Sequence, residues 1–205
     1  AVSLRDVTEA SATWFREQLA GADGGEARAY LTKRGLTGQT ISTFALGYAP
    51  DARGRLREVL AKFGDPLAIE AGMLIQPPDD APANRREPYD RFRGRLMIPI
   101  RDARGRTIAF GGRILGAGEP KYLNSPDTPL FDKGRILFNL DRAAAAARKA
   151  ERLIVVEGYM DVIALAQAGI EEAVAPLGTA LTEDQIALAW RHVATPVLAF
   201  DGDAA

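Results

Sequence analysis

Three acidic side chains directly follow two apolar runs near the end of the sequence. Glu157 comes after Leu-Ile-Val-Val and precedes a glycine, and Asp201 and Asp203 flank a glycine after Val-Leu-Ala-Phe. The carboxyl ends of parallel strands meet at one edge of a sheet, so we expect the three carboxylates to converge. Carboxylates this close repel one another, and a divalent cation such as Mg²⁺ relieves that repulsion. The spacing therefore predicts a metal site.

Each acidic motif also has an ordinary structural interpretation. The sequence DGD alone is typical of a turn, and EGYMD alone is typical of a helix start capped by Asp161. The two motifs at matching strand ends favour the metal site. In that interpretation Asp161 supports the metal ligands.

The elements that would hold the acids follow a β-α-β-α-β pattern. Strands are predicted over 153–156, 173–175 and 197–200, and helices over 161–168 and 182–192. Short strands alternating with helices indicate an α/β domain with a parallel sheet. Both acid-bearing strands are apolar throughout, so we expect them to be central and buried. A further helix is predicted over 135–150.

The charges of the chain are unevenly distributed. Residues 85–135 hold twelve basic and six acidic side chains, whereas eight acids and one arginine lie from Glu157 onward. Within the basic part, Arg91, Arg93 and Arg95 alternate, so we expect them on one face of a strand. Basic side chains close in sequence to an aromatic ring are suited to bind phosphates and unstacked bases. These residues are Arg113, Lys121, Tyr122, Asn124 and Lys133. The alternative is a sheet that shows its polar face to water.

The rest of the chain predicts a mixed α+β region. Helices are expected over 4–20, 26–34, 37–44, 53–63 and 65–71, a short strand over 46–48, and a loop over 75–88. Two strand-like runs within 91–115 meet at the turn Asp102–Gly105. We therefore predict a basic α+β subdomain over 1–150 and an α/β domain over 151–205.

Composition excludes several classes of protein. The chain has no cysteine, so disulfides and Cys-ligated zinc are excluded within it. No apolar run approaches the roughly 18 residues of a membrane-spanning helix, and no secretory signal is visible. His192 is expected to be structural or exposed, and Trp14 and Trp190 are expected in the core.

Several motifs in order resemble one family. YLTKRGLTGQTISTFALGYAP (30–50), RFRGRLMIPIRDARGRTIAFGGRIL (91–115), PKYLNSPDTPLF (120–131) and VVEGYMDVIALAQAGI (155–170) are similar to the catalytic core of bacterial DnaG-type DNA primases. The last part looks like a Toprim domain. That fold would be an α+β basic subdomain followed by an α/β Toprim-type domain, truncated here.

The resemblance implies a DNA-directed RNA polymerase, a nucleotidyltransferase that makes short RNA primers by two-metal phosphoryl transfer. Glu157, Asp201 and Asp203 would hold Mg²⁺ or Mn²⁺, supported by Asp161. Template and nucleotides would be bound by Arg34, Arg91, Arg93, Arg113, Lys121, Tyr122, Asn124 and Lys133. The implied partners are single-stranded DNA, ribonucleoside triphosphates and the replicative helicase, at the replication fork in the bacterial cytoplasm and with no membrane.

The sequence departs from the family pattern at both ends. The zinc-binding domain that precedes the family's core and the helicase-binding domain that follows it are not in this sequence. Family Toprim domains also carry another acidic pair after the position that corresponds to Ala205. We therefore expect weak or no primer synthesis from this chain alone.

Two other classes of function remain open. The chain could be a non-catalytic module that binds single-stranded DNA and nucleotides, in which case Asp201→Ala would leave binding unchanged. It could also be a Toprim nuclease or topoisomerase. That interpretation needs a nucleophile, and Tyr159 beside Glu157 is the local candidate, although it is expected to pack instead.

Overall fold

The computed structural model describes residues 2–202, so Asp203 lies outside the described residues. The chain divides into two compact units. The first comprises residues 2–35, 45–99 and 107–131, and the second comprises 36–44, 100–106 and 132–202. Each compact unit is built from three separate stretches of the chain. The predicted division of the sequence at residue 150 stays a prediction.

The first unit contains half of the predicted helices and the antiparallel sheets. Its helices are α1 (Leu4–Ala20), α2 (Gly25–Lys33), α4 (Arg55–Leu60) and α5 (Asp65–Glu70). A four-stranded sheet has the order β1 (Gly47–Ala49), β4 (Arg95–Arg101), β5 (Thr107–Ile114) and β6 (Tyr122–Asn124), and the last two residues of β4 fall in the second unit. A separate antiparallel pair is formed by β2 (Leu74–Ile75) and β3 (Tyr89–Asp90).

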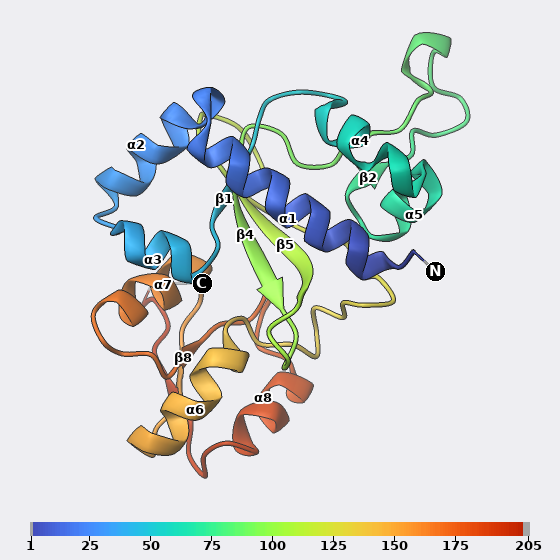
Figure 1. Ribbon diagram of the computed structural model, residues 1–205. Coiled ribbons are helices and arrows are strands. Elements are labelled where there is room, and N and C mark those ends of the chain that lie inside the picture. Colours follow the sequence, from blue (N-terminus) through green and yellow to red (C-terminus); the bar gives the residue numbers. More distant parts are fainter. Residues whose placement is uncertain (1, 203–205) are drawn as a thin grey trace. The chain divides into compact units, whose positions relative to one another are not determined.

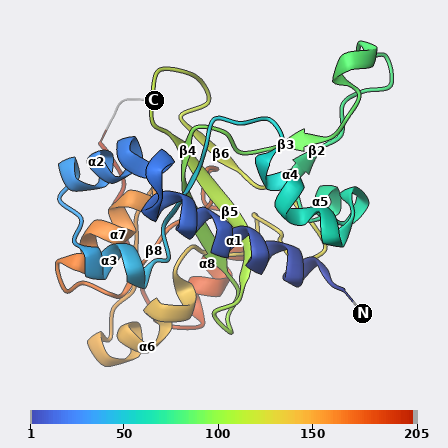
Figure 2. The ribbon, with the colours of Figure 1, turned by 45° about the horizontal axis from the view of Figure 1, so that its top comes forward.

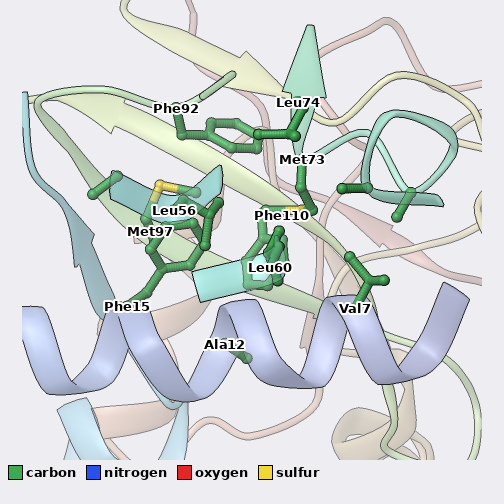
Figure 3. Close-up of a cluster of buried hydrophobic side chains, with 13 residues drawn as sticks. Val7, Ala12, Phe15, Leu56, Leu60, Met73, Leu74, Phe92, Met97 and Phe110 are labelled. Carbon is green, nitrogen blue, oxygen red and sulfur yellow. The ribbon is translucent and has the colours of Figure 1, made fainter. Parts of the chain in front are cut away.

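Helix α1 lies across the sheet of the first unit (Figure 1). A capping box starts the helix, because the Ser3 hydroxyl accepts from the Asp6 amide while the Ser3 amide donates to the Asp6 carboxylate. Val7, Ala12 and Phe15 recur at helical spacing and face a cluster of buried side chains (Figure 3). The Phe15 ring meets the Phe110 ring edge-on, 5.2 Å between centroids.

The segment between β2 and β3 is a loop with one 3₁₀ turn (Ala83–Arg85), as predicted for 75–88. Figure 1 shows it projecting away from α4 and α5. After β3 the prediction for the arginines was wrong. Strand β4 begins only at Arg95, because Gly94 has a φ of +61° and breaks the extended run. Arg91 and Arg93 therefore do not share a strand face with Arg95, which is buried.

The turn between β4 and β5 has the predicted chemistry. Gly105 has a φ of +75°. The Asp102 carboxylate accepts from the amides of Arg104 and Arg106 at 2.9 and 3.0 Å, and from the Arg106 guanidinium at 2.8 Å. Burial alone would raise the pKa of Asp102, but these hydrogen bonds outweigh it and hold the pKa below its ordinary value.

The second unit is the α/β part, with a three-stranded sheet in the order β8 (Ala173–Val174), β7 (Ile154–Val155), β9 (Val197–Leu198). Both pairings are parallel, as predicted. Its helices are α3 (Gly38–Thr43), α6 (Leu140–Ala150), α7 (Tyr159–Gln167) and α8 (Glu183–Trp190). Helices α3 and α7 lie side by side (Figure 2). Leu153, Val155 and Val174 pack with Ala143, Ala147 and Ala189 in its core.

Helix α6 begins five residues later than predicted. Asn139, just before it, has a φ of +71°, and Phe138 forms a bridge with Ala175, so residues before 139 are not helical. The side-chain amide of Asn139 donates to the Ala173 carbonyl at 3.0 Å, which fixes this conformation.

Strand β9 does not have the central, buried position that its apolar sequence predicts. It is an edge strand, and Val197 and Leu198 are 45% and 57% exposed. Trp190 on α8, expected in the core, is 61% exposed. An apolar run indicates that a strand can be buried. It does not reveal whether another part of the described chain covers that strand.

Candidate metal edge and nucleic-acid surface

The predicted metal ligands stand where two parallel strands end. Glu157 follows β7 and Asp201 follows β9, and these strands are direct neighbours. The backbone amide of Asp201 donates to the Glu157 carboxylate at 3.0 Å, so the two residues are adjacent. Both side chains are exposed. The structure therefore brings together two of the three predicted acids, and the third, Asp203, is outside the described residues.

The expected role of Asp161 as a helix cap was wrong. Gly158 is the N-cap residue of α7, and no side chain caps this end. Asp161 lies in the first turn of the helix, exposed, and a Cβ atom on Gly158 would stand 3.4 Å from its carboxylate. The Asp161 carboxylate is thus close to the residue that follows Glu157, where the helix dipole favours a negative charge.

The donors at this edge suit a hard divalent cation, which prefers carboxylate oxygens. Glu157 and Asp201 would hold the cation. Among residues 2–202, no group of three His, Cys, Asp or Glu side chains is arranged as a complete metal site. The described part of the chain therefore offers two adjacent carboxylates as candidate ligands.

Arg91 and Arg93 lie in the segment between β3 and β4. The Arg91 guanidinium donates to the Asn124 carbonyl at 2.8 and 3.3 Å, and burial lowers its pKa. Arg93 is exposed, with its guanidinium carbon 5.5 Å from the centroid of the Tyr89 ring. Arg91 thus ties this segment to β6, whereas Arg93 presents its charge to solvent.

Arg113, Tyr122 and Arg34 lie in one neighbourhood of the first unit. Arg113 on β5 is opposite Tyr122 on β6 in the strand register. Burial raises the pKa of Tyr122, and so does its neighbour Tyr30, whereas the positive charges of Arg113 and Arg34 and a hydrogen bond from Arg113 act in the opposite direction. Arg113 and Tyr122 are therefore neighbours in the sheet, and their role in binding stays a prediction.

The remaining predicted residues differ in exposure. Lys121 is exposed, and its carbonyl accepts from the Ile114 amide. Asn124 is half-buried at the end of β6. Lys133 is half-buried in the second unit, where its carbonyl accepts from the Gln185 side chain.

Two aromatic residues beside the arginines were missed by the sequence reasoning. The Tyr30 ring lies 4.6 Å from the guanidinium carbon of Arg113 and 5.8 Å from that of Arg34. Tyr89 has Arg53 at 4.2 Å and Arg93 at 5.5 Å from its ring centroid. The spacing of Tyr30 and Arg34, four residues apart on a helix, was a signal that could have identified the first contact.

The candidate nucleophile of the nuclease alternative is not accessible. Tyr159 is 3% exposed, and its ring packs edge-on against Phe138 with centroids 4.8 Å apart. The residue is part of the core, as expected. No described helix is long and apolar enough to cross a membrane.

The parallel α/β unit with acids at its strand ends is that of a protein with a Toprim domain. The family model for the DNA primase catalytic core, N-terminal domain, matches residues 14–144, and that for the Toprim domain matches residues 151–205. The chain belongs to the DnaG-type DNA primase family.

Relatives agree with this assignment. The chain is 48% identical to the DNA primase of Neisseria meningitidis serogroup A over 87% of its length, and 46% identical to that of Escherichia coli K12 over 94%. It covers 29% and 32% of these relatives, or about a third of their length.

Solved structures show the same fold. A DNA primase domain from Pseudomonas aeruginosa matches with a TM-score of 0.90 and 45% identity, over 98% of this chain and 62% of that one. A DnaG primase catalytic domain bound to single-stranded DNA matches with a TM-score of 0.86 and 45% identity, over 98% and 61%. A Toprim domain in a primase implies a divalent metal, which agrees with the carboxylate oxygens at the edge of β7 and β9.

Proposed function

We propose that this chain forms part of the catalytic core of a DNA primase, which joins ribonucleotides into short RNA primers on a single-stranded DNA template. The observation that carries the proposal is the adjacency of Glu157 and Asp201 at neighbouring strand ends in a chain of this family. Its substrates would be ribonucleoside triphosphates, and its setting the bacterial cytoplasm at the replication fork. A replicative helicase would be the partner of the full-length protein.

In this proposal Glu157, Asp201 and Asp203 bind Mg²⁺ or Mn²⁺, and Asp161 supports them. When bound, the metal lowers the pKa of the primer 3′-hydroxyl and neutralises charge on the triphosphate. Glu157 and Asp201 contribute by standing at the ends of paired strands, so their carboxylates are held close together before the metal binds. Phosphoryl transfer between fixed groups depends mainly on such positioning.

The basic residues bind template and nucleotide phosphates. Arg34, Arg93, Arg113 and Lys121 bring positive charge to the surface of the first unit, and Tyr122 offers a ring for stacking. Arg91, which already donates to the Asn124 carbonyl, would hold Asn124 and its strand in place while adding charge. Lys133 would bind phosphate from the second unit.

The test is template-directed incorporation of labelled ribonucleotides by the full-length protein, with Asp201→Asn and Glu157→Gln variants. We expect each substitution to reduce primer synthesis by more than about 100-fold, because each removes a metal ligand. Single-stranded DNA binding should stay within about twofold of wild type. Incorporation that does not depend on template would contradict the proposal, as would full activity in both variants.

A further inference from the structure

Tyr30 stands at the junction of two arginines that are distant in sequence. It lies on α2, one turn before Arg34, and its backbone carbonyl accepts from the Arg34 amide at 3.0 Å. Arg113 comes from β5. Both guanidinium carbons lie within 6 Å of the Tyr30 ring centroid, the range in which the negative face of a ring attracts a cation.

Two guanidinium groups beside one ring must repel each other. Arginine stays charged at any pH that proteins meet, so the repulsion is not relieved by losing a proton. No acidic side chain forms an ion pair with either arginine among the described residues. The ring of Tyr30 therefore supplies an attraction to both cations that partly offsets their repulsion.

The polar atoms around the ring strengthen this description. The Tyr30 hydroxyl and the Arg113 Nε atom are both buried, and neither has a hydrogen-bond partner within the described part of the chain. The hydroxyl thus makes no hydrogen bond that would explain the position of Tyr30. The structure does place the face of the ring against both guanidinium groups, and Arg113 also donates to the Ile114 carbonyl and to Tyr122.

We propose that Tyr30 is a positioning residue of the nucleic-acid surface, whose ring holds Arg34 and Arg113 together to face one phosphate group or two neighbouring ones. This role rests on the proposed function, because it assumes that both arginines bind phosphate. Tyr30 does not itself contact the nucleic acid and acts through the two arginines.

The test measures the dissociation constant of a labelled oligothymidylate for the protein and five variants. These are Tyr30→Leu, Tyr30→Phe, Arg34→Ala, Arg113→Ala and the double variant Tyr30→Leu/Arg113→Ala. Tyr30→Leu should weaken binding by about 2- to 30-fold, the range that cation–π interactions represent. Tyr30→Phe keeps the ring and removes only the unpartnered hydroxyl, so its affinity should stay within about twofold of wild type.

The double variant separates positioning from general packing. If Tyr30 acts through Arg113, Tyr30→Leu should cost much less in the Arg113→Ala background than in wild type. The linear dependence of log affinity on log salt should also become shallower in Tyr30→Leu, by up to about 0.7 for each phosphate that the protein no longer neutralises. Thermal unfolding of each variant detects any damage to the fold. Such damage would weaken binding by the same factor in both backgrounds and would not produce this coupling.

The outcomes distinguish the two proposals. If Arg34→Ala and Arg113→Ala both leave the affinity unchanged, the assignment of these arginines is wrong, and the role of Tyr30 falls with it. If they weaken binding but Tyr30→Leu does not, or if its cost is the same in both backgrounds, only the role of Tyr30 is overturned.

Discussion

At the scale of single residues, basic side chains of the first unit differ in burial and therefore in role. Arg95 is buried and donates to the carbonyls of Gly112 and Lys121 at 3.0 and 3.4 Å, and burial lowers its pKa. Lys121 is exposed. The alternation of Arg91, Arg93 and Arg95 in the sequence predicted that the three side chains share one strand face. The break at Gly94 is a backbone property that alternation does not reveal.

We expect Arg95→Ala to lower the free energy of unfolding by about 2 kcal/mol or more, because it removes the buried hydrogen bonds of Arg95 to the Gly112 and Lys121 carbonyls and opens a void. Lys121→Ala should change that free energy by less than about 0.5 kcal/mol. Chemical denaturation of the two variants checks this contrast. Equal stability of the two variants would show that Arg95 is not a structural residue.

The candidate site was predictable from the sequence in part. The position of Glu157 and Asp201 followed from two apolar runs ending in acids, and the strands do pair in parallel. The ring contacts of Tyr30 and Tyr89 were not predictable from alternation, because Arg113 and Tyr30 lie 83 residues apart and meet only through tertiary packing.

At the scale of elements, a close approach between helix α1 and strand β1 determines how these two elements of the first unit pack. Gly47 on β1 stands against Phe15 on α1, and a Cβ atom on this glycine would lie 2.6 Å from the Phe15 Cβ atom and 2.7 Å from its carbonyl carbon. Backbone atoms cannot move aside as a side chain can. The sequence predicted both elements, but not that a glycine sets the distance between them.

Gly47→Ala should therefore destabilise the chain by about 1–3 kcal/mol through overpacking. Gly25→Ala is the matched control, since Gly25 begins α2 with helical angles and only the Arg28 side chain lies within 4 Å. That change should be neutral or slightly stabilising. Thermal unfolding of the two variants measures the difference. A similar fall in melting temperature for both variants would indicate a general effect of alanine and contradict the role of Gly47.

In the second unit, an ion pair ties the starts of two parallel strands. Arg152 precedes β7 and Glu172 precedes β8, and the Arg152 Nε atom donates to the Glu172 carboxylate at 3.1 Å. This hydrogen bond holds the pKa of the buried Glu172 below its ordinary value of 4.5. A group with a lowered folded-state pKa contributes stability above its unfolded pKa and loses it as pH falls through the folded value.

Arg152→Ala should accordingly lower the free energy of unfolding by about 1 kcal/mol at neutral pH, because the Arg152 side chain is half exposed and water screens the pair. The difference from wild type should shrink as the pH falls below the ordinary value of 4.5, where Glu172 becomes protonated in both proteins. Denaturation at a series of pH values gives the curve. A difference that grew as the pH fell would contradict the assigned role of Glu172.

At the scale of the whole molecule, the net charge of −1 hides a separation of charge along the chain. The excess of basic residues over 85–135 and the acidic stretch from Glu157 onward were visible in the sequence. Compositional bias shows which stretch can attract nucleic acid. It does not show how the chain divides in space, since the compact units combine three separate stretches each.

Single-stranded DNA should bind this chain with an affinity that falls steeply with salt, despite its net negative charge, because local phosphate contacts release counterions. Lys121→Ala should make the salt slope shallower by about 0.7, the effect of one neutralised phosphate on a single strand. Glu183→Gln, an exposed change on α8, should leave the slope as it is. Fluorescence anisotropy at several salt concentrations would measure all three slopes, and identical slopes for Lys121→Ala and wild type would exclude a phosphate contact at Lys121.

The two tryptophans of the chain fall one in each compact unit, in contrasting surroundings. Trp14 packs against the core of the first unit, with its ring 5.6 Å from that of Phe15, whereas Trp190 of the second unit is largely exposed. Their intrinsic emission should therefore differ in wavelength and in sensitivity to quenchers. A Trp190→Phe chain would keep Trp14 as its one tryptophan, and its emission would follow the melting of the first unit separately from that of the second.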